Sequence, residues 1–156
     1  GGGQAGVATG GCAADAASSE SDVAGLAPGD IAKLPRERRL ELAAEEKTKG
    51  NESFQAHDWS EAIAHYTRSL RLDQGSAAVY ANRSLAHIKE KNWRAAESDA
   101  TAALEIQGDY TKALLRRGIA RRRMGKHALA VSDFRAVLSA EPGHREAKDY
   151  LRASTI

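Results

Sequence analysis

The sequence predicts an all-α protein, and two observations lead to this prediction. Alanine occupies 31 of the 156 positions and charged residues make up 28%, whereas aromatic residues make up only 5%. This composition favours helices over strands. The second observation is an internal period of 34 residues, which is typical of helix–turn–helix units stacked side by side. No run of about 18 apolar residues occurs, so no membrane-spanning helix is expected.

Five columns of similar residues share the 34-residue period. Small residues at fixed positions let two helices approach closely, and large residues in other columns fill the space between neighbouring units. So many columns with one spacing indicate three copies of one structural unit. The columns are Ala62, Ala96 and Ala130; Leu70, Leu104 and Leu138; Gly50, Ser84 and Gly118; Trp59, Trp93 and His127; and, more loosely, Tyr66, Ala100 and Phe134.

The period predicts three pairs of helices and one final helix. The first helix begins after Pro35, because the fixed φ of proline suits a first helical turn. The last helix, 143–153, sets charged residues beside Ala147 and Leu151, as expected of a polar cap on an open stack. Gly125 and Gly143 suit the turns between helices. The paired helices are expected at 36–56 and 60–72, 76–90 and 93–106, and 110–124 and 127–140.

The first part of the chain has a different composition. Eight of the 14 glycines fall in residues 1–29, together with many Ala, Ser and Asp residues and no helical or strand periodicity. Such a segment buries too little apolar surface to offset its ordering entropy. We therefore expect a flexible segment over residues 1–35, in which Ile31 and Leu34 dock on the helices that follow. The single cysteine, Cys12, lies here without a partner and favours a reducing compartment.

The three repeats resemble tetratricopeptide repeats (TPRs). The resemblance covers residues 43–144, and it is carried by the columns and by stretches such as "DWSEAIAHYTRSLRLD" and "YANRSLAHIKEKNWRAAESDATAALEI". It implies that residues 36–156 form a TPR solenoid, a right-handed superhelix of three repeats plus a C-terminal capping helix. The repeats run 43–76, 77–110 and 111–144.

In such a stack the first helix of each repeat lines the concave face. Residues that share one helical face recur every three or four positions. Two mid-helix Asn residues lie on these faces, where Asn has poor helix propensity. Three of the cations on them, Lys47, Lys112 and Arg116, would repel one another without an anion between them. We therefore expect a site for peptide carboxylates. The faces hold Lys47, Asn51 and Phe54; Asn82, Leu85 and Lys89; and Lys112 and Arg116.

The five polar residues resemble the carboxylate clamp of TPR co-chaperones. That motif reads K-x-x-x-N, then N in "YANRS", then K-x-x-x-R, and all five positions match here. The family binds the acidic Glu-Glu-Val-Asp C-terminus of Hsp90 and cytosolic Hsp70. The resemblance implies that Arg116 contacts the tail further upstream or the side chain of the terminal Asp, and that Phe54, Leu85 and Lys89 form a secondary groove. The residues implied to hold the terminal Asp are Lys47, Asn51, Asn82 and Lys112.

The third repeat also resembles the RNA polymerase II-associated and sperm-associated antigen group, which links Hsp90 to the assembly of large complexes. The expected function is therefore that of a cytoplasmic, or additionally nuclear, peptide-binding adaptor. One alternative is a TPR scaffold that binds another protein segment. In that case Trp59 and Trp93 would be contact residues, although their positions predict packing at the turn inside each repeat.

A nucleic-acid-binding helical repeat is a weaker alternative. Residues 111–135 carry eight cations against one acid. However, a helix spreads Arg121, Arg122 and Arg123 over about 200°, so they cannot all face one phosphate strand. No phosphate loop, nucleophile elbow or paired-carboxylate spacing is present, and the five histidines form no metal-ligand pattern. We therefore expect no enzyme, no metal and no cofactor.

Overall fold

The computed structural model describes residues 23–154, which are helical throughout apart from short connections. A 3-10 turn, η1 (Val23–Gly25), precedes the α-helices. The predicted helix bounds agree with the structure to within two residues at every end. The α-helices are α2 (Pro28–Lys33), α3 (Arg36–Gln55), α4 (Trp59–Leu72), α5 (Ala77–Lys89), α6 (Trp93–Ile106), α7 (Thr111–Arg123), α8 (His127–Ala140) and α9 (Arg145–Ser154).

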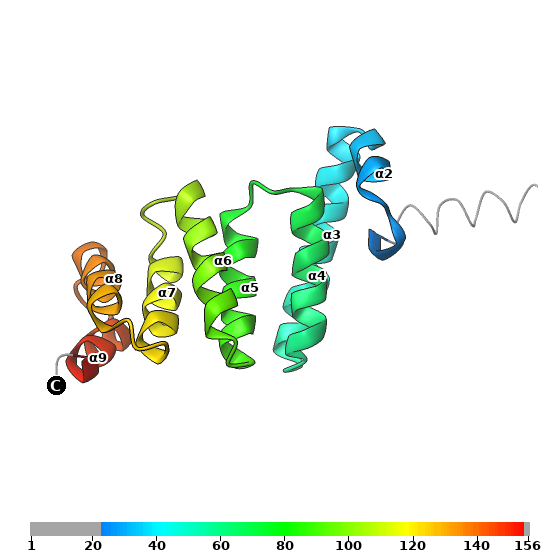
Figure 1. Ribbon diagram of the computed structural model, residues 1–156. Coiled ribbons are helices and arrows are strands. Elements are labelled where there is room, and N and C mark those ends of the chain that lie inside the picture. The colour runs from blue at the N-terminus through cyan, green and yellow to red at the C-terminus, as the bar shows by residue number, and fades with distance from the viewer. Residues whose placement is uncertain (1–22, 155–156) are drawn as a thin grey trace, which may run out of the picture.

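Helices α3 to α8 form a row in chain order (Figure 1). Each repeat is one hairpin, α3 with α4, α5 with α6 and α7 with α8, and α9 packs against α8 and α7 at the C-terminal end. Side-chain caps mark the starts of α4, α5 and α6, since Asp58, Ser76 and Asn92 each accept a hydrogen bond from a backbone N–H of the following first turn. The prediction of an all-α stack of three helix pairs with a final capping helix is confirmed.

In the first and third hairpins, a glycine lies opposite the aromatic ring of the Tyr66 column. A Cβ added to Gly50 would lie 2.6 Å from the ring of Tyr66, and one added to Gly118 would lie 2.6 Å from the ring of Phe134. In the middle repeat, Ser84 donates a hydrogen bond of 2.8 Å to the Ala96 carbonyl. The repeated small residues are therefore needed for close contact between the two helices of a repeat.

The N-terminal boundary differs from the expected one. Residues 1–22 of the expected flexible segment lie outside the described residues, but the part that follows packs on the first repeat. Val23 and Ile31 are buried against Leu42 and Leu72, and the Arg71 guanidinium donates a hydrogen bond of 2.6 Å to the Leu26 carbonyl. These apolar side chains pack on the apolar end that α3 and α4 offer. Residues 23–34 therefore extend the stack.

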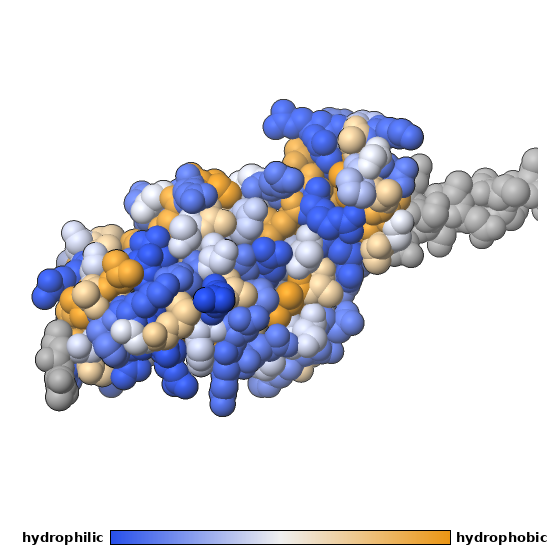
Figure 2. Space-filling view, viewed as in Figure 1, coloured by the Kyte–Doolittle hydropathy of each residue, from blue (hydrophilic) through white to orange (hydrophobic). Residues whose placement is uncertain are grey.

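The two tryptophans lie at the turns, as their positions predict, and they are half-buried. Trp59 meets Phe54 edge-on with ring centroids 4.9 Å apart. Trp93 lies under the Arg123 guanidinium, 4.7 Å from the ring centroid. Within residues 23–154, no helix is long and apolar enough to cross a membrane. The face shown in Figure 2 is mostly hydrophilic, with apolar residues scattered among charged ones.

Candidate functional site

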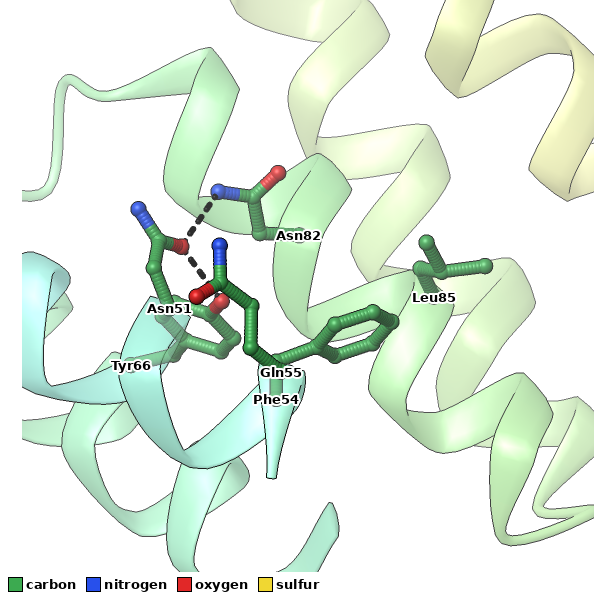
Figure 3. Close-up of a pocket in the computed structure, with 6 residues that line it drawn as sticks. All are labelled: Asn51, Phe54, Gln55, Tyr66, Asn82 and Leu85. Carbon is green, nitrogen blue, oxygen red and sulfur yellow. Dashed lines mark hydrogen bonds between the residues drawn. The ribbon is translucent and has the colours of Figure 1, made fainter. Parts of the chain in front are cut away.

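A hollow of about 190 Å³ lies where α3, α4 and α5 meet (Figure 3). Four of the predicted site residues line it, and Gln55 and Tyr66 line it as well. One side of the hollow is polar and the other carries the apolar side chains of Phe54 and Leu85. The predicted residues brought together here are Asn51, Phe54, Asn82 and Leu85.

The side chain of Asn51 is held by two hydrogen bonds. Its Oδ1 accepts one from the Tyr66 hydroxyl at 2.6 Å and one from Asn82 Nδ2 at 3.3 Å. Figure 3 shows this oxygen turned toward both partners and the amide nitrogen turned away from them. An amide nitrogen offers two N–H donors. Asn51 therefore presents donors, and no acceptor, to an incoming group.

Sequence reasoning did not assign Tyr66 to the site. Tyr66 was recognised only as a member of a packing column, and its ring does fill the space over Gly50. Its hydroxyl, however, reaches the hollow. Burial raises the pKa of Tyr66, while the charge of Arg116 acts in the opposite direction. The hydroxyl therefore keeps its proton at neutral pH and donates to Asn51.

Arg116 connects the third repeat to the second beside this hollow. Its Nη1 donates a hydrogen bond of 3.0 Å to the carbonyl of Ala81, the residue before Asn82. Burial lowers the pKa of the Arg116 guanidinium, and Tyr110 and Glu146 oppose that effect. The guanidinium keeps its charge, as arginine does in proteins. It has further N–H donors besides the one that Ala81 engages.

The two predicted lysines do not line the hollow. Lys47 is half-buried one helical turn before Asn51, and Lys112 is exposed one turn before Arg116. Within residues 23–154, neither ammonium group makes a hydrogen bond or an ion pair with another residue. Both charges are therefore free to meet an external anion on the side of the first helices.

Lys89, the third residue of the predicted secondary groove, lies further along. Its ammonium nitrogen is 5.8 Å from the centroid of the Trp59 ring, a cation–π contact. Since Trp59 also contacts Phe54, an aromatic pair joins Lys89 to the apolar side of the hollow. Trp59, a residue that the sequence assigned to packing, thus links Lys89 to Phe54 among the residues predicted for the secondary groove.

The basic run of the third repeat is largely engaged inside the protein. Arg117 and Arg121 both bind the carboxylate of Asp133, at 2.8 and 2.9 Å. Arg121 also binds Glu97, as does Lys126. Burial acts to raise the pKa of Glu97, but hydrogen bonds from these two cations outweigh it, and the net pKa is lowered.

The neighbouring arginines lie over aromatic rings and do not form a line. Arg122 lies 5.7 Å from the ring centroid of Tyr150, and Arg123 lies over Trp93 on another element. A row of cations that could follow a phosphate backbone is therefore not formed by this run. Among residues 23–154, no group of three His, Cys, Asp or Glu side chains could hold a metal ion.

These features define a class of protein: a helical-repeat domain with a hollow lined by amides of α3 and α5, and with unpaired lysines on the first helices of its first and third repeats. Solved structures of the same architecture are similar to it. The Arabidopsis OM64 TPR domain is 33% identical with a TM-score of 0.73, over 74% of this chain and 96% of that one. The first TPR of Spaghetti (RPAP3), bound to the HSP90 peptide SRMEEVD, is 36% identical with a TM-score of 0.72. The match covers 72% of this chain and 90% of that one. The chain belongs to the TPR-domain family.

The second TPR domain of human RPAP3, solved with the HSP70 peptide SGPTIEEVD, is also 36% identical with a TM-score of 0.72, over 78% of this chain and 99% of that one. Among curated proteins, rat sperm-associated antigen 1 is 43% identical over 122 residues, which are 78% of this chain and 14% of that protein. Mouse serine/threonine-protein phosphatase 5 is 35% identical over 114 residues, which are 73% of this chain and 23% of that protein. The chain thus spans less than a quarter of these curated relatives. No family model matches it.

Proposed function

We propose that this domain is a peptide-binding adaptor that clamps the acidic Glu-Glu-Val-Asp C-terminus of Hsp90, Hsp70 or both, and so links the chaperone to a client or an assembling complex. The observation that carries this proposal is the pair Asn51 and Asn82, hydrogen-bonded to each other at a hollow. The unpaired Lys47 lies one helical turn before Asn51 on α3. Two TPR domains of similar sequence were solved with peptides ending in EEVD, which supports the choice of ligand.

The chemistry matches a doubly charged C-terminal Asp. Its two carboxylates need several donors, and the amide of Asn51 with the ammonium groups of Lys47 and Lys112 supplies them. The Arg116 guanidinium adds a positive charge between α5 and α7, while one of its N–H groups stays hydrogen-bonded to the Ala81 carbonyl. Phe54 and Leu85 form an apolar wall for the residues upstream of the terminal Asp. These residues bind and orient a peptide, and we propose no catalytic role for them.

The expected affinity is moderate. Each charge-assisted hydrogen bond contributes about 1.5–3 kcal/mol, but ordering a flexible tail offsets much of the sum. We expect a dissociation constant near micromolar, which corresponds to a binding free energy of about −8 kcal/mol.

Titration calorimetry with an acetylated Met-Glu-Glu-Val-Asp peptide tests the proposal. The free-acid peptide should bind, whereas the same peptide with an amidated C-terminus should bind at least about tenfold more weakly, because one carboxylate is gone. Equal, weak binding of both peptides would rule out the clamp. Parallel titrations with SRMEEVD and SGPTIEEVD, the peptides of the similar domains, measure the preference between the two chaperones.

A further inference from the structure

We infer that the hydroxyl of Tyr66 is a positioning group of the carboxylate site. It holds the amide of Asn51 so that both N–H donors face the incoming carboxylate. This inference rests on the function proposed above for the ligand, but the positioning itself can be measured without any ligand. Tyr66 acts through Asn51 and does not itself contact the peptide.

Packing alone does not require this hydroxyl. The same column of the third repeat holds Phe134, whose ring faces Gly118 as closely as the ring of Tyr66 faces Gly50, with a Cβ-to-ring distance of 2.6 Å in both cases. Both rings are almost completely buried, at 1% and 0% exposure. A phenylalanine therefore performs the packing role within this same chain. The hydroxyl is additional, and it lies at the hollow.

The hydrogen-bond geometry explains what the hydroxyl adds. A carbonyl oxygen has two lone pairs, and those of Asn51 Oδ1 are matched by Tyr66 and Asn82. The bond from Tyr66, at 2.6 Å, is much the shorter of the two. If it is removed, only the 3.3 Å contact with Asn82 opposes rotation of the amide. The two amides can then turn together and present an oxygen to the carboxylate, which repels it.

The phenol is itself held firmly. Gly50, the residue before Asn51, leaves room for the Tyr66 ring and for no added Cβ, so the ring packs closely against the backbone of α3. The side-chain oxygen of Asn51 thus accepts from the Tyr66 hydroxyl, whose position is fixed by the close packing of α3 on α4. Such preorganised donors lose little entropy when an anion binds.

The test compares Tyr66→Phe with wild type and with Ser69→Ala. Ser69 is a matched control, because its buried hydroxyl also joins α4 to α3, with a bond of 2.8 Å to the Ala43 carbonyl, and it does not line the hollow. Tyr66→Phe should weaken binding of the free-acid peptide by about threefold to tenfold. Ser69→Ala should lower the melting temperature and change the affinity by less than about twofold, as expected for the loss of one hydrogen bond away from the ligand.

A double-mutant cycle separates positioning from general loosening. In an Asn51→Ala background, Tyr66→Phe should have almost no further effect on affinity, since the amide on which it acts is absent. A full effect in that background, or no effect of Tyr66→Phe in wild type, would overturn the inference.

A second readout needs no peptide. The side-chain NH₂ signals of Asn51, assigned by their loss in Asn51→Ala, should shift in the NMR spectrum of free Tyr66→Phe and stay unchanged in Ser69→Ala. Unchanged Asn51 signals in Tyr66→Phe would contradict the positioning role. If wild type fails to bind the peptide, the proposed function fails, and these signals still decide whether Tyr66 positions Asn51.

Discussion

Lys112 and Arg116 lie one turn apart on α7, and their surroundings give substitutions at the two positions different consequences. Arg116 is half-buried and bonded to the Ala81 carbonyl, so its removal affects both the site and the contact between the second and third repeats. Lys112 is exposed and makes no ion pair within residues 23–154. Of the two, Lys112 is therefore the cleaner test of ligand binding.

Lys112→Ala should weaken binding of the free-acid peptide by about tenfold to a hundredfold, since one charge-assisted bond contributes about 1.5–3 kcal/mol. Helical content and melting temperature should stay unchanged. Arg135→Ala is the control, because Arg135 is an exposed cation on α8 of the same repeat and its loss changes the net charge equally. If both variants lose the same affinity, overall charge attracts the peptide and Lys112 is not a specific contact.

The small residues of the hairpins have an equally local effect. A Cβ on Gly118 would meet the ring of Phe134 at 2.6 Å, and a buried ring cannot move away freely. Gly118→Ala should therefore lower the free energy of unfolding by about 1–3 kcal/mol, measured by urea denaturation. Gly143→Ala should be nearly neutral, since nothing lies within 4 Å of its added Cβ. Similar losses of unfolding free energy in the two variants would show that α7 and α8 are packed less closely than this 2.6 Å distance indicates.

At the scale of elements, ion pairs join the two helices of a hairpin. Arg83 binds Asp99 between α5 and α6, and Arg117 binds Asp133 between α7 and α8. These pairs are 34 residues apart, so they form a further column of the repeat. In the first repeat the corresponding positions hold Lys49 and His65, and the buried carboxylate there is Glu46, which is bonded to His65 and Arg68.

Asp133 accepts from both Arg117 and Arg121 while only 3% exposed. Asp133→Asn should therefore cost about 3 kcal/mol of unfolding free energy, because it leaves two guanidinium groups without their shared charge partner. Glu41→Gln breaks the exposed Arg38–Glu41 pair and should cost less than about 1 kcal/mol. Chemical denaturation followed by circular dichroism measures both. An equally small loss for Asp133→Asn would mean that packing alone holds α7 to α8.

The helices could be predicted from sequence because the 34-residue period averages over three copies, so errors at one position are corrected by the others. The spacing of three or four residues along the first helices identified Asn51 and Asn82, which the structure joins by a hydrogen bond. It could not show that Tyr66 adds a hydroxyl to the site or that Arg116 bonds to Ala81, since both depend on how side chains turn between helices. The paired column of Asp99 and Asp133 was visible in the sequence and was missed.

At the scale of the molecule, the stack is thin and its core is divided into small clusters along its length. Much of the apolar interior is alanine, which explains how a protein with 5% aromatic residues packs closely. Such a stack has two open ends, and each needs a cover. The sequence predicted the cover at the C-terminal end, α9. The cover at the other end, η1 and α2, was expected to belong to a flexible segment, because no repeat includes it.

Ile31→Ala tests whether that N-terminal cover is part of the folded domain. Ile31 is 7% exposed and packs with Leu42 and Leu72, so its truncation should lower the free energy of unfolding by about 2 kcal/mol. Lys33→Ala, at an exposed position of the same helix, should change it by less than about 0.5 kcal/mol. Peptide affinity should be unchanged in both variants, because neither residue lines the hollow. A neutral Ile31→Ala would instead place the start of the stable domain at residue 36, as the composition of the chain first indicated.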